Sequence, residues 1–272
     1  MLLTSSTDAA ATPAAIESPP GPRHLTILTG GSRGMGLAMA LQLLSADRLL
    51  LCISRQRNAS LDAEAKAIGA RVEQWSFDLA DASQAAAQLA SWLAAPAADT
   101  YATATLINNA GVVPRITPLA DARSEDIALG LRVGLEAPML LTAAFLSATS
   151  GWVGERRVLN ISSGLGRRAM ASQGPYCAAK AGMDHFTRCL ALEEAARHNG
   201  ARVCSLAPGV IDTDMQTHLR SADPATFADQ QGFARMKAEG QLTSPDDAAR
   251  RVLAFLARPD FGSDPVSDVR AG

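Results

Sequence analysis

The chain has 272 residues, 47% of them hydrophobic and 19% charged, so it can bury a large core within one α/β domain. A formal net charge of −2 gives no general basic character and argues against nucleic acid or an anionic membrane surface as a partner. Four cysteines without a CxxC pair and four scattered histidines give no metal-ligand spacing, so we expect no metal site and a reducing, cytoplasmic location.

Residues 1–22 are rich in Ala, Thr, Ser and Pro. They lack the basic start and the continuous apolar core of a secretory signal, so we expect a disordered leader, with a weak organelle address as the alternative. No uninterrupted apolar run approaches the roughly 18 to 20 residues that cross a bilayer, and we expect no membrane span. Residues 23–272 are predicted to form a single domain.

From His24 onward, short apolar segments alternate with segments of helical periodicity. The predicted strands are 25–28, 48–53, 71–77, 103–107, 157–161, 202–206 and 266–269. The predicted helices are 36–45, 61–68, 82–94, 124–147, a helix around Tyr176 that ends near His198, and 246–257. This alternation predicts a doubly wound, Rossmann-type α/β domain with a central parallel sheet of about seven strands flanked by helices.

Tyr176 and Lys180 lie four residues apart in a segment predicted to be helical, so their side chains would share one face. A nearby ammonium favours the phenolate and brings the tyrosine pKa down toward the working pH, which suits a general acid or base. Ser163 follows a predicted strand, thirteen residues before Tyr176, and could hold a carbonyl oxygen beside the phenol. These three are candidate catalytic residues. A core serine, an interface tyrosine and a surface lysine are the alternative.

The loop after the first strand reads TGGSRGMG from Thr29 to Gly36. Glycines let the backbone turn sharply and approach a pyrophosphate, while the following helix offers free N–H groups. The spacing differs from G-x-G-x-x-G, so an ordinary strand-to-helix turn is the alternative. The candidate cofactor-binding residues in this loop are Gly30, Ser32, Arg33, Gly34, Met35 and Gly36.

The second strand ends without the carboxylate that usually bonds the ribose of NAD. Ser54, Arg55 and Arg33 could converge on a 2′-phosphate through charge-assisted hydrogen bonds, which favours NADP(H). Solvated loop charges at Arg55 and Arg57 are the alternative. Asp78, after the third strand, could meet the adenine amino group or cap the next helix.

Two further motifs follow strand ends. Asn108 to Gly111 reads NNAG after the fourth strand, and Pro208-Gly209 followed by Thr213 comes after the sixth. Together with the glycine loop and the Ser163, Tyr176 and Lys180 spacing, they make the chain resemble the short-chain dehydrogenase/reductase family over about residues 24 to 270.

The resemblance implies a role for each matching position. It implies that Tyr176 donates a proton, that Ser163 orients the substrate carbonyl, and that Lys180 bonds the nicotinamide ribose and lowers the tyrosine pKa. It also implies that Asn109 braces the central strand. The further residues expected to line the cofactor site are Ala110, Gly111, Pro208, Gly209, Ile211 and Thr213.

The implied activity is reversible, NADPH-dependent reduction of a ketone or aldehyde to an alcohol, as in carbonyl reductases. The implied assembly is a homodimer or homotetramer formed through the long helices. Family members usually carry an asparagine in the long helix after the fourth strand, where it supports a water near the lysine. Gly134 stands in that place here, so it could leave room for an extra water or slow turnover. Pro138 should kink the same helix, because it has no N–H.

The segment from about 208 to 242 is predicted to be a mobile lid over an apolar pocket. The candidate substrate-binding residues are Ser163, Leu165, Met170 and Met215, with Val113 beside them. The alternative is that these apolar side chains only pack the lid on the sheet. A small or medium apolar ketone or diketone fits best, as in relatives of the sepiapterin or benzil reductase type, with a β-ketoacyl thioester or a steroid as the alternative substrates. An NADP-binding sensor or scaffold with weak catalysis is the alternative function.

Overall fold

The computed structural model describes residues 22–270, so all but the last residue of the predicted leader lie outside the described part. Seven parallel strands form one sheet in the order β3-β2-β1-β4-β5-β6-β7. The strands are β1 (His24–Thr29), β2 (Arg48–Ser54), β3 (Arg71–Ser76), β4 (Thr103–Asn108), β5 (Glu155–Ile161), β6 (Arg202–Ala207) and β7 (Val266–Asp268). The predicted doubly wound fold and its number of strands are confirmed.

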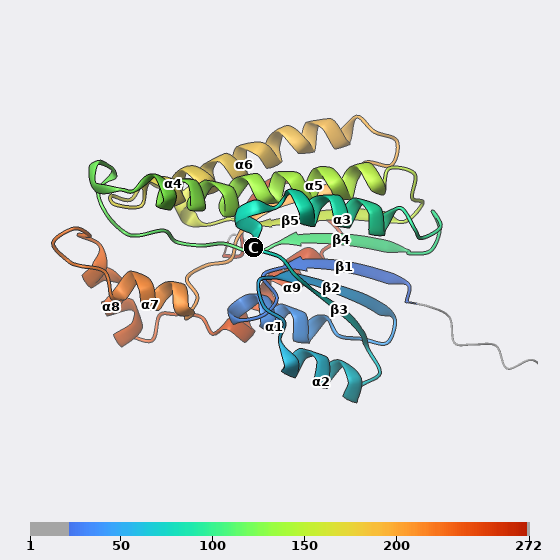
Figure 1. Ribbon diagram of the computed structural model, residues 1–272, viewed down its shortest axis with the longest axis horizontal. Helices are drawn as coiled ribbons and strands as arrows, with labels where there is room; N and C mark the ends of the chain where they lie inside the picture. Colours follow the sequence, from blue (N-terminus) through green and yellow to red (C-terminus); the bar gives the residue numbers. More distant parts are fainter. Residues whose placement is uncertain (1–21, 271–272) are drawn as a thin grey trace, which may run out of the picture.

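Helices cover both faces of the sheet (Figure 1). One face carries α3 (Ser83–Leu93), α4 (Ser124–Leu131), α5 (Ala137–Ala148) and α6 (Gly174–Ala195); the other carries α1 (Gly34–Leu43), α2 (Ala59–Ala67) and α9 (Pro245–Leu256). Two more helices, α7 (Asp214–Arg220) and α8 (Gln230–Ala238), lie beyond the end of the sheet toward which the strand arrows point. They form the segment predicted as a lid.

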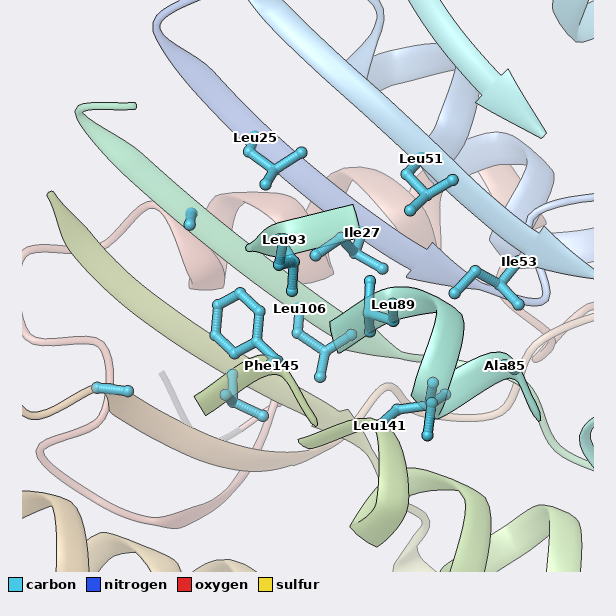
Figure 2. Packing of buried hydrophobic residues seen from close by; sticks show 14 of the residues in the cluster. Leu25, Ile27, Leu51, Ile53, Ala85, Leu89, Leu93, Leu106, Leu141 and Phe145 are labelled. Atoms are coloured by element: carbon cyan, nitrogen blue, oxygen red, sulfur yellow. The ribbon is translucent and has the colours of Figure 1, made fainter. Parts of the chain in front are cut away.

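Successive side chains of a strand point to opposite faces of the sheet. Because helices cover both faces here, apolar residues follow one another along the strands. On β1, Ile27 belongs to the cluster under α3 and α5, while Leu28 belongs to the cluster under α1 and α9. Figure 2 shows the first layer, in which Leu89 of α3, Leu106 of β4 and Phe145 of α5 meet with no exposed surface. Both faces are therefore packed, and the loops at the carboxyl ends of the strands are left to carry a site.

The predicted long helix 124–147 is interrupted. The five residues Arg132–Glu136 form a π-helical turn, η3, between α4 and α5, and the Ala137 N–H donates to the Arg132 carbonyl. Pro138 in the first turn of α5 has no N–H to offer the Gly134 carbonyl, which explains why the ordinary α-helical pattern fails here. The kink expected from Pro138 therefore takes the form of a widened, π-helical turn just before this proline.

The whole stretch from Ser124 to Ala148 is 25 residues long and has a mean hydropathy of 1.4 over its most apolar window. By length and composition alone it could cross a bilayer, although Arg132 and Glu136 interrupt its apolar run. Buried core helices have the same properties, and this one contacts α3 and α6. Its apolar character is accounted for by that packing.

Candidate active site

The glycine loop leaves β1 in a backbone conformation that requires its glycines. Gly30 has φ +71° and Gly34 has φ +55°, both in the left-handed region. A Cβ on Gly36 would lie 2.0 Å from the Gly30 carbonyl oxygen, so no side chain fits there. No side chain among residues 22–270 caps the first turn of α1, and its N–H groups remain available to an anion. The loop therefore has the geometry of a phosphate cradle.

Asn109 joins the ends of β1 and β4 behind this cradle. Its side-chain Nδ2 donates to the Thr29 carbonyl at 3.0 Å and to the Gly30 carbonyl at 3.3 Å. The backbone N–H groups of Asn109 and Ala110 both donate to the Thr29 hydroxyl at 2.9 Å. The side chain thus braces the two strand ends, as the sequence predicts for Asn109.

Two of the predicted cofactor-binding residues have side chains that are engaged in other contacts. Met35 is buried in the core under α1, so only its backbone can face a ligand. The Asp78 carboxylate accepts a hydrogen bond from the Ala80 N–H at 3.0 Å, which supports the capping alternative for this residue.

The predicted phosphate-binding cations have different surroundings in this structure. The Arg33 guanidinium pairs with Asp214 at the start of α7 at 2.9 Å, whereas Arg55 is exposed. Arg57 pairs with Asp62 at 3.3 Å. Ser54 is buried, and its Oγ has no hydrogen-bond partner within the described chain, which leaves a donor at the end of β2.

Tyr176 and Lys180 share one face of α6, as predicted, and both are buried. The Lys180 Nζ lies 5.9 Å from the centre of the Tyr176 ring and donates to the Ile161 carbonyl at 2.7 Å. A Cβ on Gly111 would lie 3.9 Å from the same Nζ, so the lysine reaches the NNAG loop. Ser163 opens the short 3-10 turn η4 (Gly164–Gly166), where its Oγ accepts from the Leu165 N–H at 3.2 Å.

The segment between β6 and α7 returns to the glycine loop. Pro208 is buried, Gly209 has φ +86°, and Ile211 forms an isolated parallel bridge with Thr243. A Cβ on Gly34 would lie 3.5 Å from the Thr213 Cγ2, so this segment touches the cradle. Of the predicted cofactor residues in this segment, Thr213 therefore lies against the glycine loop.

A family model for short chain dehydrogenases matches residues 24–224. The chain belongs to the short-chain dehydrogenase/reductase family. It is therefore an oxidoreductase with the fold of this family.

Relatives support the same assignment along the chain. The benzil reductase ((S)-benzoin forming) of Bacillus cereus is 35% identical over 235 residues, which are 86% of this chain and 94% of the relative. The sepiapterin reductase of Meriones unguiculatus is 32% identical over 249 residues, covering 87% of this chain and 92% of the relative. The crystal structure of a metagenomic short-chain oxidoreductase in complex with NADP is 25% identical with a TM-score of 0.67, covering 92% of this chain and 96% of that one.

The residues of this short-chain dehydrogenase/reductase fit a nicotinamide dinucleotide. The contact of Gly36 with the Gly30 carbonyl leaves a cradle that any Cβ would fill, and the unpaired Ser54 Oγ lies at the end of β2. Gly30, Gly34 and Gly36 would hold the pyrophosphate and Ser54 the adenosine ribose side. When bound, this group supplies or accepts a hydride.

The electrostatics of the catalytic residues correct the sequence interpretation. Burial raises the pKa of Tyr176, and a hydrogen bond with the Ser163 hydroxyl opposes that rise. Burial also lowers the pKa of Lys180 from 10.5 to about 8, opposed by the Asp184 carboxylate. The pKa of Tyr176 is therefore raised and not lowered as expected, because burial of the phenol outweighs the hydrogen bond that opposes it.

Gly134 lies where α4 and α5 approach α6. A Cβ at this position would be 2.9 Å from the Cβ of Ala179, the residue before Lys180. The first side-chain carbon of the family's asparagine would therefore meet α6.

The predicted substrate residues divide into two groups. Met170 is buried with Ile116, Leu219, Phe227 and Phe233 in a third apolar cluster, which we call the lid cluster. Leu165, Val113 and Cys177 pack against this cluster. These contacts are the ones expected if the apolar side chains pack the lid onto the rest of the domain. Met215 is partly exposed and is not a member of the lid cluster.

Three residues beside the site were missed by sequence reasoning. Ser172 has φ +62°, unusual for serine, and its Oγ donates to the Thr226 carbonyl of the lid at 2.5 Å. Arg167 and Asp184 form an ion pair at 3.0 Å beside Ser163 and Lys180. The sequence offered one signal for this pair, which is the aspartate four residues after Lys180 on the same face of the predicted helix.

Proposed function

We propose that the protein uses NADPH to reduce a small or medium apolar ketone or diketone to an alcohol. The observation that carries the proposal is the buried pair of Tyr176 and Lys180, with the partly buried Ser163, beside the NNAG loop and the glycine cradle. Similarity to a benzil reductase and a sepiapterin reductase favours a dicarbonyl or a related apolar carbonyl compound. The apolar lid cluster, packed against Leu165, suits such a substrate.

The raised pKa of Tyr176 suits the reductive direction, because the phenol keeps its proton at neutral pH. Tyr176 would donate this proton to the carbonyl oxygen while the Ser163 hydroxyl donates a hydrogen bond to the same oxygen. A protonated Lys180 would stabilise the phenolate that remains. Hydride to carbon and proton to oxygen together make the alcohol.

The catalytic part is tested with Tyr176→Phe. NADPH consumption against a panel of ketones and 1,2-diketones should fall by roughly 100-fold or more, because general acid catalysis contributes about that much. NADPH binding, followed by its fluorescence, should remain. Wild-type protein that binds NADPH tightly but consumes none would instead support the sensor or scaffold function, for which the glycine at position 134 is the supporting observation.

The preference for NADPH rests on Arg33, Arg55 and Ser54 and on the lack of a carboxylate at the end of β2. Replacing both arginines with alanine should raise the KM for NADPH by about tenfold or more and leave the KM for NADH nearly unchanged. Arg57→Ala is the matched control, because Arg57 lies in the same loop but pairs with Asp62. Equal losses for NADPH and NADH would contradict the proposal.

We also propose that the chain forms a homodimer or homotetramer through α4, α5 and α6. Exposed apolar side chains lie on these helices at Leu129, Leu131, Met139 and Leu192. Light scattering on the wild type and on Leu192→Glu would test it. A monomeric wild type at micromolar concentration would contradict it.

A further inference from the structure

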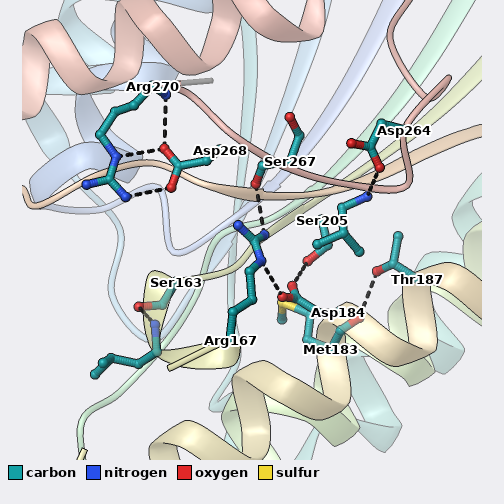
Figure 3. A network of polar contacts seen from close by, with 12 residues as sticks. Ser163, Arg167, Met183, Asp184, Thr187, Ser205, Asp264, Ser267, Asp268 and Arg270 are labelled. Carbon is teal, nitrogen blue, oxygen red and sulfur yellow. Dashed lines mark hydrogen bonds and ion pairs between the residues drawn. The ribbon is translucent and has the colours of Figure 1, made fainter. Parts of the chain in front are cut away.

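Asp184 lies one helical turn beyond Lys180 on α6 and is 2% exposed. Its carboxylate is held from two sides: Oδ1 accepts from the Ser205 hydroxyl of β6 at 2.6 Å, and Oδ2 accepts from the Arg167 Nε at 3.0 Å. Arg167 also donates through Nη2 to the Ser267 carbonyl of β7 at 2.9 Å. Figure 3 shows these contacts joining α6, the loop after η4 and the last two strands.

Arg167 directly follows the turn that Ser163 opens. Within this turn Gly166 packs on the backbone of α6, since a Cβ at Gly166 would lie 2.9 Å from the Lys180 carbonyl oxygen and 3.1 Å from the Asp184 Oδ2. The Arg167–Asp184 ion pair therefore fixes the Ser163 turn against α6 at the level of Lys180. The carbonyl-orienting residue and the proton-donating helix are held together at this point.

The pair also determines the electrostatic surroundings of Lys180. The Nζ of this buried lysine donates to the Ile161 carbonyl, which is an uncharged acceptor. Asp184 is the carboxylate that raises the pKa of Lys180 against the effect of burial. The cation of Arg167 lies beside that carboxylate and reduces its influence.

Other titratable and charged groups surround the pair. On α6 they are Tyr176 and Cys177, and burial raises the pKa of Tyr176. From β6, β7 and the loop between them they are Cys204, Asp264, Asp268 and Arg270. Burial raises the pKa of Cys204 to about 12, and Asp268 pairs with Arg270 at 2.6 Å. Asp184 and Arg167 are therefore the charges whose removal should change Lys180 most.

We propose that Asp184 and Arg167 are positioning residues for catalysis, which hold the Ser163 turn on α6 and together determine how readily Lys180 keeps its proton. The catalytic part of this inference rests on the proposed reductase function. An ion pair with a buried carboxylate and a partly exposed guanidinium adds little net stability, so we assign this pair a role in tuning the site.

The test uses two substitutions with opposite expected effects. Asp184→Asn keeps the shape and an acceptor for Ser205 but removes the negative charge, so the pKa of Lys180 should fall. Arg167→Met leaves the carboxylate without its cation, so the pKa of Lys180 should rise. Asp268→Asn is the matched control, because it makes the same chemical change at a carboxylate that also faces Arg167 but pairs with Arg270.

The first measurement is independent of activity. The chain contains three lysines, and Lys66 and Lys237 are exposed, so NMR titration of 13C-labelled lysine side chains can follow Lys180 by itself. We expect shifts of at least about half a pH unit, downward for Asp184→Asn and upward for Arg167→Met, with less than about 0.2 unit for Asp268→Asn. Equal pKa values in the wild type and Asp184→Asn would overturn the proposal.

The second measurement is the pH dependence of kcat/KM for NADPH-dependent diketone reduction. Its alkaline limb should move in the same direction as the lysine titration in each variant, whereas simple destabilisation would lower activity without opposite shifts. Unmoved limbs in both variants, with the lysine titrations shifted, would overturn the catalytic role. If wild-type protein reduces no carbonyl compound while the titrations shift as expected, the proposed function fails and the electrostatic inference stands.

Discussion

The contact between Gly134 and Ala179 allows a quantitative test of how closely α6 must approach the preceding helix. Gly134→Ala places a Cβ 2.9 Å from the Cβ of Ala179, whereas ordinary contact begins at 3.4 Å. Because both atoms lie next to backbone, the helices would have to separate. Overpacking of this kind costs about 1–3 kcal/mol, and the better helix propensity of alanine returns up to about 1 kcal/mol. With the full return from helix propensity, we expect a net loss of at most about 2 kcal/mol.

A double-mutant cycle followed by urea unfolding measures this contact directly. Ala179→Gly alone should lose about 1 kcal/mol through helix propensity, and the double variant should be more stable than the sum of the single changes by at least about 1 kcal/mol. Additive effects within about 0.5 kcal/mol would refute the close contact. Gly134→Asn, which restores the family's usual residue, should lower kcat because it displaces α6. A higher kcat would refute the conclusion that this packing positions Lys180.

Further predictions concern single positions. Gly36→Ala should abolish NADPH binding measured by fluorescence, whereas Gly232→Ala, with nothing within 4 Å of the added Cβ, should be neutral or gain up to about 1 kcal/mol in urea unfolding. Lys180→Met should stabilise the protein at pH 7 by at most about 3 kcal/mol, because a pKa of about 8 instead of 10.5 means that the folded state holds a charge it disfavours. Wild-type stability should then rise with pH from about 8 toward 10, where the unfolded chain binds more protons, and Lys180→Met should lack this rise. Glu194→Gln should cost about 3 kcal/mol in urea unfolding by leaving the buried Arg156 unpaired.

Sequence reasoning identified the strands and the helices that cover the sheet, because strand and helix periodicity is local, but it did not predict α7 and α8. Some observed boundaries differ from the predicted ones. Helix α1 begins at Gly34, two residues earlier than predicted. Gly34 has a positive φ and follows directly on the turn after β1. The pairing of Tyr176 with Lys180 also followed from local spacing. Their pKa shifts did not, since these depend on burial by distant elements.

The residues that a side chain contacts were harder to predict than the helix or strand to which it belongs. Arg33 was expected near a phosphate, and its observed partner Asp214 lies 181 residues away in the sequence. The contact between Gly134 and Ala179 depends on the crossing of two helices, for which no pattern was available. The positive φ of Ser172 has no sequence signature, because serine rarely adopts it.

The lid cluster is separate from the two clusters that pack the sheet. The Ser172 hydroxyl and the His218 ring, which lies 3.3 Å from the Pro114 carbonyl, add polar ties between the lid and the loops beneath it. Because Ile116 and Met170 of this cluster belong to the loops beneath the lid, opening the lid would separate this small cluster while the two sheet clusters stay packed. Amide hydrogens of α7 and α8 should therefore exchange with solvent through a subglobal opening much faster than those of β1 and β4, and substrate entry needs no unfolding of the cofactor-binding part.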